Sequence, residues 1–285
     1  MSERGPVPAL PVPALPTRVA RFAGSWYPGT ATALGAAVEE ASGPEVARER
    51  ATALILPHAG WRYSLRIAAP AVARVEVPER VVFLCPNHRV PPPVVAAWPE
   101  GSWQTPLGPV PVDAELTQRL LDACPRVSAG TEAHLEEHAI EVLLPLLQRA
   151  QPQLKIVAVV VAEPSYEGLA EIGRGLAEAV RGLGGAAGEV LIVASSDMSH
   201  FLSAPEARRR DERALERLLA FDAEGLLERC VSEQISMCGV RPTVVALEAA
   251  RALGATQVEL VDYGHSGEVS GDESSVVGYA SAIVR

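Results

Sequence analysis

Three apolar segments of the chain each run into histidine or aspartate, the residue types that bind metals and transfer protons. His58 follows an apolar run and a proline in ATALILPHAGWRYS, and His88 does the same in VVFLCPNHRV. In VLIVASSDMSHF, Asp197 and His200 come just after the run. A single histidine of this kind is most simply a core residue at a strand end. Three similar segments indicate a shared site.

Cys238 has the chemistry to join such a site. It stands with Gly239 directly before a predicted helix in ISMCGVRPTVVALEAARALG, and Pro242 falls near the first turn, where proline is favoured. The partial positive charge of a helix N-terminus lowers the pKa of a cysteine and favours the thiolate, which is a nucleophile or a metal ligand. The alternative is a small buried hydrophobic residue. Because the histidines accompany it, we expect Cys238 to be a metal ligand.

Other candidate residues have simpler explanations beside the functional one. His138 and Glu141 in EEHAIEVLLPLL are three apart on a predicted helix, so both could face the same rim. It is equally plausible that both residues lie in a solvent-exposed first turn of this helix and have no part in a site. We expect His134 at the surface and His265 in a plain Gly/Ser-rich loop. The remaining cysteines are predicted to be structural: Cys85, Cys124 and Cys230.

The elements that position these residues alternate between strands and helices. Continuous Val/Ile/Leu-rich runs predict buried parallel strands at 51–57, 81–86, 155–162 and 189–195. Helical patterns fall at about 65–75, 113–124, 136–150, 166–182, 204–219 and 241–253, after a first helix that Thr30 caps and that ends near Ala41. More alternating runs at 256–263 and 275–284 predict edge or antiparallel strands. We therefore predict a single-domain α/β layered sandwich, its sheet mostly parallel or mixed, with helices on both faces.

In such a sheet, loops from several strands converge at the carboxyl ends, where ligands bind. The expected domain spans residues 18–285 and follows a Pro-rich tail, 1–17, that repeats PVPAL and is predicted to be disordered. The 285 residues carry a formal net charge of −10, which argues against nucleic-acid and membrane partners. No apolar run approaches the roughly 18–20 residues of a membrane helix. The four cysteines have no disulfide-like spacing, so we expect a cytoplasmic protein.

With these residues assembled, the sequence resembles the MEMO family, the B component of the AmmeMemoRadiSam system. The matching segments appear in family order across the whole body of the chain: GSWYPG (24–29), PHAGWRYS (57–64), LCPNH (84–88), EEHAIE (136–141), SSDMSHF (195–201), MCGVRP (237–242) and DESSVVGYAS (272–281).

This resemblance implies a fold similar to the class III, LigB-like extradiol dioxygenases, which hold one non-haem ferrous iron on two histidines and a glutamate. The family's metal-binding residues, two histidines and a cysteine, correspond to His58, His88 and Cys238. Its pocket aspartate and histidine correspond to Asp197 and His200. Its pocket aromatic corresponds to Trp26, and we count Tyr63, His138 and Glu141 as further pocket residues.

Family properties also suggest partners and activities. Animal members have been described as binding phosphotyrosine peptides and as redox proteins that use copper or iron. Bacterial members accompany a radical-SAM protein and an AMMECR-type protein.

Two imidazoles and an anionic ligand leave positions open on a metal, as oxygen-activating iron sites do. We expect iron(II) first, copper second and zinc third. His200 is the candidate general acid or base, with Asp197 orienting it or holding a ligand histidine. Because a cysteine replaces the glutamate, catechol ring cleavage does not carry over.

The leading hypothesis is a metal-dependent, oxygenase-like redox enzyme acting on an unidentified small molecule or peptide. The alternatives are a non-catalytic module binding a peptide or anion in the same pocket, and a protein that handles copper or iron.

Overall fold

Four short, largely apolar strands form the centre of the protein in the computed structural model, which describes residues 15–44, 46–91, 94–184 and 189–285. The parallel strands lie in the order β2, β9, β3, β8 and are the ones that the apolar runs predict: β2 (Ala53–Leu56), β9 (Val190–Ser195), β3 (Arg80–Cys85) and β8 (Lys155–Val161).

Antiparallel strands extend this sheet on both sides. Next to β2 runs β12 (Val276–Val284), which also pairs antiparallel with β11 (Val258–His265) and with the short β10 (His200–Leu202). Beyond β8 come β4 (Val95–Ala97), which is antiparallel to it, and β7 (Ser128–Ala129). Among the described residues this sheet has nine strands and is mixed. The predicted antiparallel character of the two late strands is confirmed.

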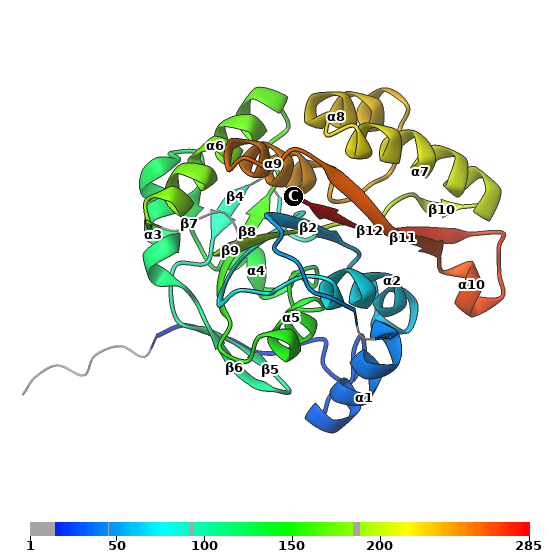
Figure 1. Ribbon diagram of the computed structural model, residues 1–285, viewed down its shortest axis with the longest axis horizontal. Helices are drawn as coiled ribbons and strands as arrows, with labels where there is room; N and C mark the ends of the chain where they lie inside the picture. Colours follow the sequence, from blue (N-terminus) through cyan, green and yellow to red (C-terminus); the bar gives the residue numbers. More distant parts are fainter. Residues whose placement is uncertain (1–14, 45, 92–93, 185–188) are drawn as a thin grey trace, which may run out of the picture.

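Helices cover both faces of the sheet (Figure 1). One face carries α3 (Ala114–Ala123), α6 (Tyr166–Arg181), α7 (Ala204–Leu219), α8 (Ala223–Ser232) and α9 (Val240–Ala252). The other carries α1 (Ala31–Ser42), α2 (Trp61–Ala73) and α5 (Leu144–Ala150). Alternate residues of a strand point to opposite faces, so Val82 and Leu84 of β3 pack in one core while Val81 and Phe83 pack in the other. The predicted layered α/β domain is confirmed.

A second, small sheet holds the start of the described chain. It contains β1 (Thr17–Arg18), β5 (Ser102–Thr105) and β6 (Gly108–Pro111), with β1 parallel to β5. Residues 1–14 of the predicted tail lie outside the described residues, but Thr17 pairs with Ser102 in this sheet.

The predicted helix at 136–150 is present only in its second half. A short helix, α4 (Glu132–Leu135), is followed by turns, and α5 begins only at Leu144. Pro145 lies in the first turn of α5, and because it has no backbone N–H it cannot continue a helix arriving from the preceding residues. The irregular segment 136–143 crosses to the central strands, where its side chains and carbonyls meet the candidate site.

A last short helix, α10 (Gly267–Ser270), follows β11. Within the described parts of the chain, no helix combines the length and apolar character needed to cross a membrane. Three consecutive arginines on α7, 208–210, each lie within ion-pair distance of a glutamate, Glu206 or Glu212, so they form no free basic patch.

Candidate metal centre

Three side chains converge where the central strands end. His58 comes two residues after β2, His88 three after β3, and Cys238 two before α9. One donor atom from each of these residues lies within 4.8 Å of the other two, and Cys238 Sγ lies 3.4 Å from His58 Nε2. The structure therefore brings together the three residues for which metal binding was expected.

A serine at the end of β9 fixes the ring of His58. Ser195 Oγ is 2.7 Å from both the carbonyl oxygen of Ala139 and His58 Nδ1. The single hydroxyl proton goes to the carbonyl, which can only accept, so Ser195 accepts the second bond from His58 Nδ1–H. The lone pair of His58 is thereby left on Nε2, facing Cys238. Burial lowers the pKa of His58 to about 3, so this ring is neutral.

His88 is held by a carboxylate instead. Glu137, which is 1% exposed, lies with Oε1 2.9 Å from His88 Nδ1 and accepts the backbone N–H of His88 at 2.8 Å on Oε2. Burial would raise the pKa of Glu137, but hydrogen bonds from His88 and the charges of His88 and His138 lower it to about 2. An ionised Glu137 accepts from Nδ1–H and leaves Nε2 of His88 free.

The thiol of Cys238 does not behave as the sequence predicts. Burial, followed by the charge of Asp197, raises the pKa of this thiol well above its usual range, although the backbone N–H of Asp197 lies 3.3 Å from Sγ. The helix begins only at Val240, and the end of a helix dipole is a weaker influence than loss of solvent. Without a cation, these surroundings favour the thiol over the expected helix-stabilised thiolate.

A cavity of about 600 Å³ opens beside His58 and His88, and its lining includes most of the other predicted site residues. Asp197, His200, Trp26, Tyr63 and His138 all contribute to its wall. The ring of His138 lies 4.5 Å from Trp26 and is stacked at 4.9 Å on His88, centroid to centroid.

Asp197 and His200 are anchored in different ways. Asp197 Oδ1 accepts the backbone N–H of His58 at 2.8 Å and of Ala59 at 3.3 Å, and burial raises its pKa to about 6. His200 Nδ1 lies 2.9 Å from the carbonyl oxygen of Ser236, to which it donates, so its Nε2 remains available toward the cavity. Asp197 thus fixes the His58 loop, whereas His200 presents its Nε2 to the cavity.

Glu141 does not line the cavity, contrary to prediction. It is fully buried, forms an ion pair with Arg18, and accepts from the backbone N–H of Phe22 at 2.7 Å and from the Tyr27 hydroxyl at 2.9 Å. The expected helix that would have turned it toward His138 is absent. Its role is to fasten the segment that carries Trp26.

His134 is not at the surface, and this expectation is also wrong. Its side chain is buried beside Trp98 and Trp103, and its Nε2 donates to the carbonyl of Ala96 at 3.1 Å. Cys85, Cys124 and Cys230 are buried, as predicted.

Glu137 and Ser195 are the residues of the site that sequence reasoning missed. Both stand inside motifs already noted, EEHAIE and SSDMSHF, next to residues with assigned roles. A buried carboxylate adjacent to a site histidine is a signal for a group that orients an imidazole. Glu137, His88 and His138 also form a second group whose donor atoms lie within 4.8 Å.

The fold and these side chains define a mixed α/β protein with a candidate His/His/Cys metal centre at the carboxyl ends of its parallel strands. Residues 18–283 match the Memo-like protein family. A MEMO1 family protein of Aquifex aeolicus is 39% identical over 263 residues, covering 92% of this chain and 96% of the relative. Another from Thermotoga neapolitana is 40% identical over 234 residues, covering 81% and 82%. The chain belongs to the Memo-like family.

A solved structure shares the fold at low sequence identity. The uncharacterized protein JW3007 from Escherichia coli K12 superposes with a TM-score of 0.55 at 16% identity, over 82% of this chain and all of that one. This similarity supports the architecture alone.

Proposed function

We propose that the protein is a metal-dependent redox enzyme that holds one ion on His58, His88 and Cys238 and transforms a small molecule in the adjoining cavity. The observation that carries the proposal is the convergence of three donor atoms of metal-binding type within 4.8 Å, two of them on histidines that line a cavity of about 600 Å³. A set of one sulfur and two imidazole nitrogens suits iron, copper or zinc and disfavours calcium and magnesium.

The surroundings of the donors fit a cation. Both imidazoles use Nδ1–H to reach a fixed acceptor, Ser195 or Glu137, which is how metal-binding histidines are usually oriented. The buried His58 ring is neutral, as a ligand must be. A cation at Cys238 would have to displace the proton of a thiol whose pKa burial raises, and its positive charge would then stabilise the thiolate.

Iron(II) is our first assignment, copper the second and zinc the third. When bound, iron or copper would supply one-electron and oxygen chemistry that no side chain of this chain provides. The protein's contribution is to hold three ligands from one side, which leaves the cavity side open to a substrate.

Residues around the centre would bind the substrate and move its protons. His200 Nε2 faces the cavity and is positioned to take a proton from a substrate or return it. Trp26 and His138 form an aromatic wall against which a flat group can pack. Asp197 keeps the backbone of His58 in place through its two accepted hydrogen bonds.

Metal analysis of anaerobically purified protein tests the proposal. We expect close to one iron or copper per chain in the wild type and in Cys230→Ala, whose sulfur is buried away from the cavity, and almost none in Cys238→Ala. His200→Gln should keep the metal but lose oxygen uptake with any small molecule that the wild type turns over. Equal metal in Cys238→Ala and the wild type would contradict the proposed ligand set.

A further inference from the structure

A second hollow adjoins the metal cavity on the other side of Trp26. It measures about 600 Å³ and lies between the loop 24–28 and helices α1 and α2. Its lining shares Ser25, Trp26 and Arg62 with the metal cavity. We call this hollow the α1–α2 groove. Because the same side chains line both hollows, a molecule bound beside the metal ligands lies next to the groove.

The groove is apolar along most of its wall. Ala37 and Ala41 of α1 line it together with Leu65 of α2 and Trp26. Small alanines on one side leave room for a ligand, while Trp26 and Leu65 give it an apolar surface. The hydrophobic effect therefore favours an apolar portion of a ligand here, by about 0.8 kcal/mol for each methylene removed from water.

The junction of the two hollows carries an unpaired positive charge. Arg62 is exposed, and among the described residues no carboxylate lies within ion-pair distance of it; its guanidinium lies 5.5 Å from the ring centre of Tyr63. No other arginine or lysine contributes to the described wall of the metal cavity. The groove's other arginine, Arg66, is paired with Glu268. The acidic residue of the groove is Glu40 on α1, so an anionic group is favoured at the Arg62 end.

We propose that the α1–α2 groove is a subsite for the distal part of an elongated, anionic substrate. An apolar chain or ring occupies the groove, a carboxylate or phosphate pairs with Arg62 at the junction, and the reacting end extends to the metal cavity. The assignment of the reacting end depends on the proposed function, but binding in the groove needs no metal.

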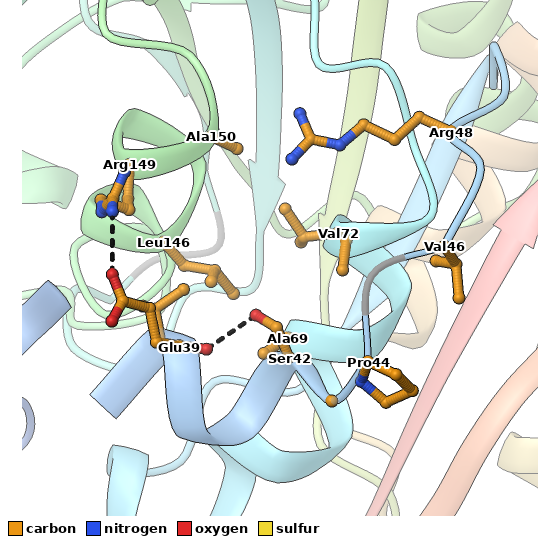
Figure 2. A pocket seen from close by; sticks show the side chains of 13 residues that line it. Glu39, Ser42, Pro44, Val46, Arg48, Ala69, Val72, Leu146, Arg149 and Ala150 are labelled. Carbon is orange, nitrogen blue, oxygen red and sulfur yellow. Dashed lines mark hydrogen bonds and ion pairs between the residues drawn. The ribbon is translucent and has the colours of Figure 1, made fainter. Parts of the chain in front are cut away.

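The remaining hollow near α1 has different properties. Between α1, α2 and α5, a hollow of about 310 Å³ is lined by Val72, Leu146 and the Glu39–Arg149 ion pair (Figure 2). It shares no residue with the metal cavity. Arg48, which lines it, serves as a matched exposed arginine for the experiment below.

Alkanoates of increasing length test the subsite directly. Butanoate, hexanoate, octanoate and the uncharged octanamide are titrated by calorimetry into metal-free and zinc-loaded protein. We expect octanoate to bind about fivefold more weakly to Arg62→Ala than to the wild type, from the loss of one partly exposed ion pair. Arg48→Ala should bind octanoate like the wild type, and octanamide should not distinguish the two arginine variants.

The apolar groove predicts a dependence on chain length. Each added methylene should tighten binding about fourfold in the wild type. In Ala37→Phe, which fills the groove, this gain should disappear, while Ala36→Phe on the exposed side of α1 should retain it. Thermal unfolding checks that both variants are folded.

The controls separate this proposal from the proposed function. Binding that is lost in metal-free protein, equal for octanoate and octanamide, or unaffected by both Arg62→Ala and Ala37→Phe would overturn the subsite. Failure of the wild type to bind metal, with groove binding intact, would overturn the proposed function alone.

Discussion

Removing the charge of Glu137 should weaken metal binding without removing a metal ligand. Its two carboxylate oxygens accept four hydrogen bonds: from His88 Nδ1 at 2.9 Å, His88 N at 2.8 Å, His138 N at 2.9 Å and Ala139 N at 3.1 Å. Glu137→Gln has the same shape, but its amide has one oxygen and one NH₂ group. If the oxygen replaces Oε1, the NH₂ group faces the backbone N–H of His88, and two donors oppose each other.

The expected loss follows from these contacts. Hydrogen bonds to a charged group are worth about 1.5–3 kcal/mol each, and one of them is lost at the residue that holds His88. That energy corresponds to a drop of roughly 10- to 100-fold in metal affinity, which is the usual cost of altering a residue that orients a ligand.

Competition for zinc(II) with a chromophoric chelator measures this loss. Glu248→Gln is the control, because Glu248 is also a buried glutamate, paired with Arg251 and outside the cavity. We expect wild-type affinity for Glu248→Gln and a lower affinity for Glu137→Gln, with both proteins folded by circular dichroism. An unchanged zinc affinity in Glu137→Gln would refute the reasoning that the carboxylate orients His88.

Three further changes probe the support of the site and the core. Ser195→Ala removes the acceptor of His58 Nδ1–H. Chelator competition should therefore show about tenfold weaker zinc binding. An affinity equal to that of the wild type would mean that Ser195 does not fix the ring of His58. In Gly239→Ala the added Cβ would lie 2.2 Å from the carbonyl oxygen of Ser195. Urea unfolding should therefore show a free energy of unfolding lower by about 1–3 kcal/mol. An unchanged free energy would show that the turn before α9 tolerates a side chain. Burial lowers the pKa of His134 from 6.5 to about 4, so the neutral ring stabilises the folded state above pH 6.5 and that stability is lost as the pH falls toward 4. His134→Gln should remove about 3 kcal/mol of this pH dependence in urea unfolding, and an unchanged profile would contradict it.

Local patterns were sufficient to predict the centre of the fold. Strands β2, β3, β8 and β9 are buried on both faces, so their apolar runs are continuous and recognisable. Helices such as α7 (Ala204–Leu219) have an apolar stripe and match their predicted bounds. The short strands between 95 and 129 were not predicted, because β4 has three residues and β6 contains two prolines.

Part of the site was predictable for the same reason. His58 and His88 directly follow strands that are themselves easy to recognise, and parallel strands bring their carboxyl ends to one edge. Contacts between distant segments were not predictable. Glu137 reaches His88 across 49 residues, and Ser195 links His58 to the carbonyl of Ala139.

The wrong predictions have physical causes that only the folded chain reveals. Glu141 is drawn from the cavity because Arg18, far away in the sequence, provides a buried partner. The Cys238 thiol is governed by its burial and by Asp197, which outweigh the end of the helix dipole.

X-ray absorption spectroscopy of the zinc-loaded protein tests the central claim most directly. We expect one sulfur ligand at about 2.3 Å and nitrogen ligands at about 2.0–2.1 Å, with the sulfur contribution absent in Cys238→Ala and retained in Cys230→Ala. A zinc spectrum with only nitrogen and oxygen ligands in the wild type would contradict the His/His/Cys centre.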